Sequence, residues 1–289
     1  MTVFEFYRDT FEPVRLLGRT ANTRIQYQVA VRHWARFTNG QQLGDIDDAL
    51  LARFLAEFSK SHAAPTTNKT RAHLLTILRF AVKRGLLREV PDVPTLPEPE
   101  EAPVAWLREE VERMLKAAAC ETGDVDGIPA APWWVSLFRG IYDSGGRIGA
   151  VLTVAPAALS LQDATMVLPG WGQKTHRWQI CGLSPATVQA IKVIWDDSRE
   201  RVWPWPYCRE TLYPHLARIC KRAGVPHGGN SGMFHRLRKT HGSYVQANGG
   251  DAQRSLGHST PAVTQRYLDP RIVGRQDASR FLPPLDLSD

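Results

Sequence analysis

Up to residue 90, apolar residues recur at the three- and four-residue spacing of amphipathic helices. The first predicted helix covers residues 24–37 and turns one face inward, made of Ile25, Val29, His33 and Phe37. The second begins near Asp45, a suitable N-cap, and buries the apolar residues Leu50, Leu51, Phe54, Leu55 and Phe58. This pattern predicts a small helical domain.

A third predicted helix is capped by Thr66 or Thr67 and ends at Gly85, with an inner face of Leu74, Ile77, Leu78 and Ala81. The segment VPDVPTLPEPEEAP follows, and its five prolines and four acids oppose regular structure. We therefore expect a helical domain over residues 1–90, a stiff linker over 91–103 and a second domain over 104–289.

The second domain mixes helices with a short sheet. Apolar residues recur at helical spacing in four segments: LREEVERMLKAA, residues 133–142, SPATVQAIKVIW and CRETLYPHLARICKRAG. The segment SGGRIGAVLTV also places apolar residues at helical spacing, after two glycines. TMVLPGWGQKTHRWQICGLS is typical of two strands around a Lys-Thr-His turn. The expected fold class is mostly α with a small β-sheet insert, an α+β chain.

The charge of the chain points to a polyanionic partner. The formal net charge is +7 and the isoelectric point is about 9.4. Residues 66–88 contain six basic residues and no acid, and residues 207–241 contain seven basic residues and Glu210. Solvated helix faces normally mix signs, so runs of one sign favour phosphate contact. The candidate DNA-binding residues are Lys69, Arg71, Arg79, Lys83 and Arg84.

Other classes of protein are disfavoured. No apolar stretch approaches the ~20 residues of a membrane helix, and the first residues carry charge throughout, unlike a signal peptide. We expect a cytoplasmic protein that associates with the nucleoid when bound to DNA. The four cysteines lack a disulfide framework. A zinc site of Cys208, His215, Cys220 and His227 is an alternative, but this spacing matches no compact finger, so we expect no metal.

Six residues in chain order could together cleave a phosphodiester without a metal: Arg147, Lys174, His235, Arg238, His258 and Tyr267. Two arginines can bracket the negative oxygens of a phosphorane, and a tyrosine can attack the phosphorus. A lysine on a hairpin can protonate the leaving oxygen. HRLR places its histidine and second arginine one helical turn apart on one face. Each residue alone is a weak signal, and the ordered set is a strong one.

Taken together, these residues resemble the tyrosine recombinases of the phage-integrase family. The resemblance covers nearly the whole chain and implies a SAM-like helical core-binding domain followed by the catalytic domain. It implies that Tyr267 forms a 3′-phosphotyrosine, that Lys174 is the general acid, and that no cofactor is needed. It also implies a tetramer on double-stranded DNA that exchanges strands through a Holliday junction. Two alternatives stay open for the C-terminal tail beyond Gly274: exchange between protomers, or folding on its own domain.

Two departures from the family pattern stand out. Ala150 occupies the position of an acid that commonly supports the first arginine, so other groups are expected to hold Arg147. The segment between Arg238 and His258 is about three residues shorter than usual, which predicts a trimmed loop at Gly249-Gly250. Tyr244 is the second candidate nucleophile, but its helical surroundings favour a core position.

Two rival functions remain open. A DNA-binding regulator could keep the fold without catalysis, although it would have no use for Lys174 or Tyr267. An enzyme similar to type IB topoisomerases would share the chemistry and relax supercoils as a monomer. Neither the DNA sequence of the site nor the choice between integration, excision and replicon-dimer resolution follows from these residues.

Overall fold

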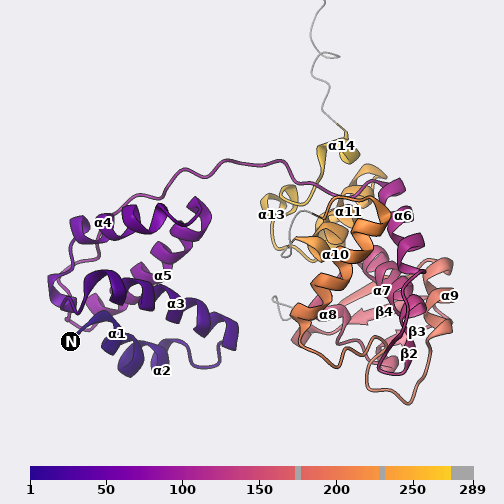
Figure 1. Cartoon of the computed structure of the whole chain (residues 1–289), viewed down its shortest axis with the longest axis horizontal. Coiled ribbons are helices and arrows are strands. Elements are labelled where there is room, and N and C mark those ends of the chain that lie inside the picture. Colours follow the sequence, from indigo (N-terminus) through magenta and orange to yellow (C-terminus); the bar gives the residue numbers. More distant parts are fainter. Residues whose placement is uncertain (173–176, 228–231, 275–289) are drawn as a thin grey trace, which may run out of the picture. The chain divides into compact units, whose positions relative to one another are not determined.

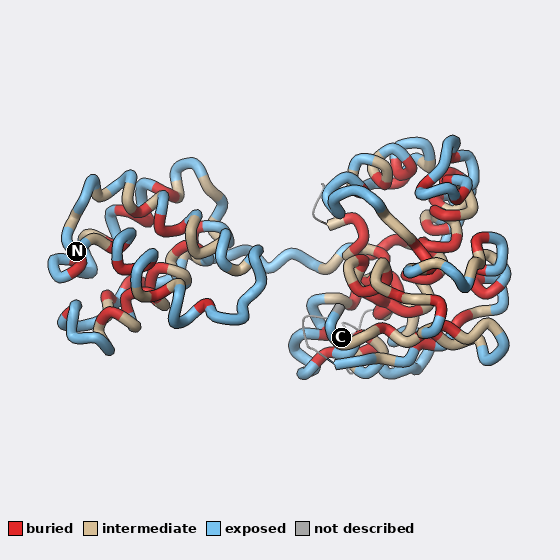
Figure 2. Tube along the Cα trace, turned by 90° about the horizontal axis from the view of Figure 1, so that it is seen from below, coloured by how far each residue is buried: buried red, intermediate tan, exposed pale blue. Residues whose placement is uncertain are grey.

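The computed structural model describes residues 1–172, 177–227 and 232–274, and within it the chain divides into two compact units (Figure 1). The first unit covers residues 1–100 and the second covers 101–289. Each unit has its own cluster of buried apolar residues, and Figure 2 shows buried segments of the chain within each unit. The boundary between them therefore lies inside the proline-rich segment expected to be the linker. No described helix is long and apolar enough to cross a membrane.

The N-terminal unit is helical. Its elements are α1 (Val3–Phe6), a π-helical turn (Tyr7–Phe11), α2 (Glu12–Arg15), α3 (Ala21–Thr38), a 3₁₀ turn (Leu43–Asp45), α4 (Asp48–Ser59) and α5 (Ala64–Lys83). The expected inner face of α5 is confirmed, since Leu74, Ile77, Leu78 and Ala81 are buried. Gly85 ends this helix, because the N–H groups of Gly85 and Leu86 return to the carbonyls of Val82 and Ala81.

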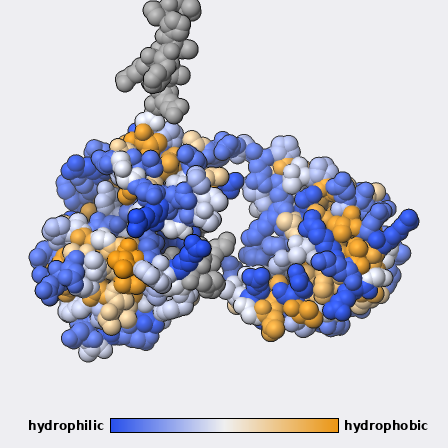
Figure 3. Space-filling view, turned by 180° about the vertical axis from the view of Figure 1, so that it is seen from behind, coloured by the Kyte–Doolittle hydropathy of each residue, from blue (hydrophilic) through white to orange (hydrophobic). Residues whose placement is uncertain are grey.

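The expected inner face of α3 is wrong. Ile25, Val29 and Phe37 are 52%, 43% and 38% exposed, and His33 is only partly buried. The buried residues are Ala30, Val31 and Trp34, with Tyr27 packed against them. Both sets have helical spacing, and the contacts of α3 with α1 and α5 select the face that carries the tryptophan. Exposed apolar residues occur on both units, as the mixed colours of Figure 3 show.

Both predicted N-caps are also wrong. The cap of α4 is Asp47, whose Oδ1 accepts a hydrogen bond from the N–H of Leu50 at 2.7 Å, whereas Asp45 belongs to the preceding 3₁₀ turn. α5 begins after Ala63 without a side-chain cap, and Pro65 lies in its first turn. Proline has no N–H to satisfy at this position, so the helix starts ahead of both threonines.

The segment after α5 contains no helix or strand from residue 90 to residue 107, and its first part lies against α5. Arg71 donates to the carbonyl of Val93 at 2.6 Å, and the side chain of Asn68 exchanges two hydrogen bonds with the backbone of Leu96. These contacts hold residues 93–96 on the N-terminal unit.

The second unit is built from helices and two small sheets, which confirms the expected α+β class. Its helices are α6 (Arg108–Ala118), α7 (Ala130–Ser144), α8 (Ile148–Val151), α9 (Pro185–Val193), α10 (Leu212–Ala223), α11 (Met233–Ala247), α12 (Ala252–Leu256), α13 (Pro261–Gln265) and α14 (Pro270–Val273). Short 3₁₀ turns cover Pro156–Ala158, Gly170–Gly172 and Arg209–Thr211.

The sheets contain more strands than the two expected. β3 (Leu159–Ser160), β4 (Thr165–Leu168) and β5 (Gln179–Gly182) form an antiparallel sheet in that order, with Leu168 opposite Gln179. A separate hairpin pairs β1 (Asp124–Val125) with β2 (Ile128–Pro129). The missed strands have two residues each, too few to show an alternating pattern.

Helix α7 lies at the centre of the second core. Its residues Trp133, Trp134, Leu137, Phe138 and Ile141 are at most 1% exposed. It contacts α6, α9 and α11, and it ends at Gly145, so a rigid element leads directly into the turn that carries Arg147.

Candidate active site

Helix α11 supplies the first two site residues. His235 is half-buried and Arg238 is 1% exposed, and their i, i+3 spacing puts both on one face of the helix. Arg238 therefore belongs to the interior of the unit, and its charge has to be satisfied there by hydrogen bonds.

Arg238 joins three elements. Its Nη1 donates to the carbonyl of Gly145 after α7, and its Nη2 donates to the carbonyl of Leu256 in α12 at 2.5 Å. Nη2 also lies 3.2 Å from Nε2 of His258. The third nitrogen of the guanidinium, Nε, is buried and has no partner among the described residues. Burial, and then the charge of Arg147, lower the pKa of Arg238 to about 10, so it stays charged at neutral pH.

The turn at Gly145 directs the chain toward Arg147. Gly145 has φ +58°, and a Cβ at this position would overlap the ring of His241. Arg147 is the N-cap residue of α8. Its Nη1 is buried and has no hydrogen-bond partner within residues 1–172, 177–227 and 232–274. Ala150, at the position where an acidic support was expected from the resemblance, is 1% exposed. No described residue takes over this role at Nη1.

His258 follows a glycine that ends α12. Gly257 has φ +63°, and the N–H of His258 returns to the carbonyl of Gln253 at 3.0 Å. After this turn, His258 is buried, with 9% of its surface exposed. Its Nδ1 lies 3.1 Å from the hydroxyl oxygen of Thr264. The Gly-His pair is thus a helix C-cap that points an imidazole at Arg238.

Tyr267 lies among these groups. Its ring centroid is 4.5 Å from that of His258, 4.8 Å from that of His235 and 5.6 Å from the guanidinium carbon of Arg238. Arg147 comes two residues after Gly145, whose carbonyl Arg238 binds, so it belongs to the same cluster. Its charge contributes to the lowered pKa values of His235, Arg238 and His258. Five of the six residues selected from the sequence therefore meet in one place.

Both histidines are neutral at physiological pH. Burial is the largest cause, and the neighbouring arginines add to it, so the pKa of His235 and that of His258 are both lowered to about 4. Neutral imidazoles can accept as well as donate hydrogen bonds, and the assembly holds its positive charge on the two arginines.

The sixth residue, Lys174, falls in 173–176, outside the described residues. The chain enters this segment after β4 and leaves it before β5, two paired strands. Tyr244 is half-buried, and its hydroxyl accepts a hydrogen bond from the N–H of Arg108 at 2.7 Å. The expected core position is therefore wrong, because its hydroxyl holds the start of α6.

The loop between α11 and α12 is short, as expected. Four residues, 248–251, connect the two helices, and the N–H groups of Gly249 and Gly250 return to the carbonyls of Gln246 and Val245. Among the described residues, no three or more His, Cys, Asp or Glu side chains gather in a way that could hold a metal ion.

The basic helix α5 exposes most of the residues selected from the sequence. Lys69, Arg79 and Lys83 lie on one exposed stripe, separated by Ala72 and Thr76, and they form no ion pair with a described residue. Arg84 is also exposed and its guanidinium lies 5.0 Å from the Phe80 ring. Arg71 differs from these, because it is half-buried and bound to Val93.

Helix α3 carries a second basic surface that the sequence reasoning missed. Arg24, Arg32 and Arg36 are exposed, and α3 contains no acid. The signal was present in the sequence, since residues 13–44 hold five arginines and no acid. This basic surface was missed because Ile25 and Val29 were assigned to the buried face of the helix, whereas both are exposed.

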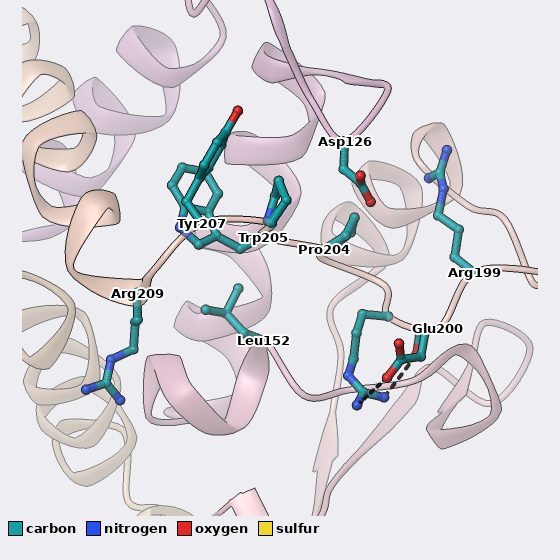
Figure 4. A pocket seen from close by; sticks show the side chains of 10 residues that line it. Asp126, Leu152, Arg199, Glu200, Pro204, Trp205, Tyr207 and Arg209 are labelled. Carbon is teal, nitrogen blue, oxygen red and sulfur yellow. Dashed lines mark hydrogen bonds and ion pairs between the residues drawn. The ribbon is translucent and has the colours of Figure 1, made fainter. Parts of the chain in front are cut away.

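A separate pocket of 440 Å³ lies beside the end of α8 (Figure 4). Leu152, Trp205 and Tyr207 line it together with three arginines. Each arginine has an acidic partner: Arg199 pairs with Asp196, Arg201 with Glu200 and Arg209 with Glu210. The pocket therefore has no excess positive charge, and it shares no lining residue with the cluster around Tyr267.

Comparison with known proteins gives structural neighbours only. No family model and no curated sequence matches the chain. A lambda integrase dimer bound to a core site is 16% identical with TM-score 0.76, over 99% of this chain and 98% of that one. A Tn1549 transposon integrase in complex with circular intermediate DNA is 15% identical with TM-score 0.77, over 97% and 98%.

XerH site-specific recombinase bound to a palindromic difH substrate is 16% identical with TM-score 0.69, over 89% of this chain and 78% of that one. These identities are low, but the matches run through both units. The chain has the fold of the tyrosine recombinases.

Proposed function

We propose that the protein is a site-specific DNA recombinase that cleaves and rejoins DNA through a 3′-phosphotyrosine at Tyr267. The observation that carries this proposal is a pair of buried guanidinium nitrogens, Nη1 of Arg147 and Nε of Arg238, in the cluster around the Tyr267 ring. Neither nitrogen has a hydrogen-bond partner among the residues that the structure describes. Buried hydrogen-bond donors nearly always have an acceptor, so two unpaired donors in one cluster favour the binding of an anion there. A phosphate would accept both.

The proposed reaction assigns one task to each residue. The Tyr267 oxygen attacks the phosphorus and passes its proton to a neutral imidazole beside it, that of His235 or His258. The bond to the 5′-oxygen breaks in the same step, and that oxygen takes a proton from Lys174. Arg147 and Arg238 stabilise the nonbridging oxygens, and the neutral His235 and His258 hydrogen-bond to the reacting phosphate. The liberated 5′-hydroxyl of a partner strand then attacks the phosphotyrosine, which restores Tyr267 and conserves the ester bond.

Double-stranded DNA is the proposed partner. The structural neighbours include complexes with a core site, a circular intermediate and a difH substrate. In this chain, the exposed stripe of Lys69, Arg79 and Lys83 and the acid-free helix α3 provide surfaces for phosphates. We further propose a tetramer that passes through a Holliday junction. Exchange of tails between protomers stays a prediction, since residues 275–289 lie outside the described part of the chain.

One experiment tests the proposal against both rivals. The protein is incubated with a nicked cognate site, denatured and resolved on a gel. A recombinase gives a covalent protein–DNA band and recombinant joints, and a topoisomerase-like enzyme gives the band and relaxes supercoiled DNA without joints. A binding protein gives neither. Absence of the band with a site that the protein binds tightly would contradict the proposed function.

A further inference from the structure

The backbone that follows Tyr267 is held by one buried hydroxyl. Oγ of Ser243, on α11, donates to the carbonyl of Tyr267 at 3.2 Å and accepts from the N–H of Asp269 at 2.8 Å. Tyr267 itself lies in a turn between α13 and α14. Its N–H donates to the carbonyl of Thr264 at 2.8 Å, and the Ser243 hydroxyl fixes the backbone on its carboxyl side.

The Asp269 side chain continues this attachment. It is 1% exposed, and its Oδ2 accepts from the N–H of Ala105 at 2.7 Å and from Nη2 of Arg271 at 2.7 Å. Oδ1 accepts from the N–H of Arg271 at 2.9 Å. Nη2 of Arg271 also donates to the carbonyl of Ala105 at 2.9 Å. The side chains of Asp269 and Arg271 therefore bind the N–H and the C=O of Ala105, respectively.

Ala105 is itself a fixed point. It is 1% exposed and lies near the start of the second unit, and the next residue, Trp106, is fully buried. The N–H of Trp106 donates to the hydroxyl of Thr240 at 2.9 Å, on the same helix as Ser243. The segment 105–106 and α11 thus form one frame around the residues that follow Tyr267.

The Asp269 carboxylate is charged in this frame. Burial would raise its pKa, but the hydrogen bonds from Arg271 and Ala105 outweigh burial and lower the pKa below its usual 3.8. A full negative charge strengthens each hydrogen bond that it accepts. The attachment is therefore intact at neutral pH.

We propose that Asp269 is a positioning residue that holds Tyr267 in place for attack by tying the turn after it to the backbone of Ala105. The inference rests on the proposed function. An attacking oxygen has to meet the phosphorus within a narrow range, and a displacement of about 1 Å can reduce the rate by on the order of 10²-fold.

The test compares Asp269→Asn and Asp269→Ala with a matched pair at Glu121. Glu121 is another buried carboxylate of the same unit, paired with Arg218 and Arg222, and it holds α10 rather than the tyrosine turn. Single-turnover formation of the covalent complex is measured at saturating protein, together with DNA affinity and melting temperature. Arg271→Gln provides a variant that keeps the Asp269 carboxylate.

We expect both Asp269 variants to bind DNA within about 3-fold of wild type and to form the covalent complex about 10- to 100-fold more slowly. Glu121→Gln, at an equal loss of melting temperature, should keep the wild-type rate within about 3-fold. Arg271→Gln should show a smaller slowing. Equal rates for Asp269→Ala and wild type, or an equal loss in the Glu121 variants, would overturn the inference.

Hydrogen exchange separates this inference from the proposed function. Asp269→Ala should speed amide exchange in residues 264–270 without changing exchange in α6 or α10. This result does not depend on cleavage, so it stands even if the wild-type protein forms no covalent complex. Unchanged exchange in residues 264–270 would overturn the positioning role whatever the activity.

Discussion

The guanidinium carbon of Arg238 lies 5.6 Å from the centroid of the Tyr267 ring. Arg238 cannot move away easily, because carbonyls of two other elements hold its terminal nitrogens and it is 1% exposed. A fixed positive charge at this position would stabilise both the oxygen that Tyr267 uses for attack and the phosphate that it attacks. Preorganisation by burial is the physical basis of the proposed site.

Tyr267→Phe should abolish the covalent protein–DNA band and leave DNA binding within about 3-fold of wild type, since only the nucleophilic oxygen is removed. Tyr244→Phe is the matched control. It should keep the band and lower the free energy of unfolding by about 1 kcal/mol, because the N–H of Arg108 loses its acceptor. A denaturing gel and urea unfolding measure the two effects. A band that persists in Tyr267→Phe and vanishes in Tyr244→Phe would reverse the assignment.

Lys174→Ala should slow cleavage of an ordinary site by about 10²- to 10⁴-fold, the usual cost of a lost general acid. Replacing the 5′-bridging oxygen by sulfur should restore its rate, since a thiol has a pKa of about 8.5 and its thiolate departs without a proton. Arg147→Ala and Arg238→Ala should gain nothing from sulfur, because they act on the nonbridging oxygens. Rescue of the arginine variants, or a lysine variant that stays inactive, would assign the acid elsewhere.

Changing Lys69, Arg79 and Lys83 together to glutamine should weaken DNA binding and reduce the slope of log K against log salt by about 2 to 3. The control, Arg53→Gln, removes an exposed charge from α4 and should have a smaller effect on both. Binding titrations at several salt concentrations measure this. Arg71→Gln should instead lower the unfolding free energy of the N-terminal unit by about 1 kcal/mol through loss of the bond to Val93. An unchanged salt slope in the triple variant would exclude α5 as a phosphate surface.

The free protein should lose stability as the pH falls from about 6.5 toward 4. In this window the unfolded chain takes up protons at His235 and His258, whereas the folded protein, with both pKa values near 4, does not. The expected loss at pH 5 is on the order of 1–2 kcal/mol for each histidine. Urea unfolding followed by tryptophan fluorescence reports on the second unit, since Trp34 is the single tryptophan of residues 1–100. The double variant His235→Asn with His258→Asn should lose less stability between pH 7.5 and 5 than wild type, and an equal loss would refute the low pKa values.

Gly145→Ala should destabilise the second unit by more than about 2 kcal/mol. Part of the cost is the left-handed backbone, about 1–2 kcal/mol, and the rest is overlap of the new methyl group with His241. In a His241→Ala background only the backbone cost should remain. A double-mutant cycle on unfolding free energies measures the difference. A cost that does not change in this background would show that the ring does not oppose the methyl group.

The sequence by itself was sufficient for the fold class and for which residues gather around Tyr267. Runs of apolar residues at helical spacing predicted the long helices, and Gly85 predicted where α5 ends, because these signals act within a few residues of chain. The site residues could be chosen because their chemistry is complementary and their order matches a known family. Five of them were found together, and Lys174 lies outside the described residues.

Tertiary structure alone decided which of two possible faces of α3 is buried, that Arg71 binds the backbone while its neighbours face solvent, and that Tyr244 caps α6. Each outcome depends on which distant segment arrives at a given surface, and local spacing does not encode this. The bond between Asp269 and Ala105 is the clearest case, since it joins residues from opposite ends of the second unit through a backbone N–H that no side-chain pattern marks. Burial and the partners of buried polar groups are properties of the assembled core, so only the folded chain determines them.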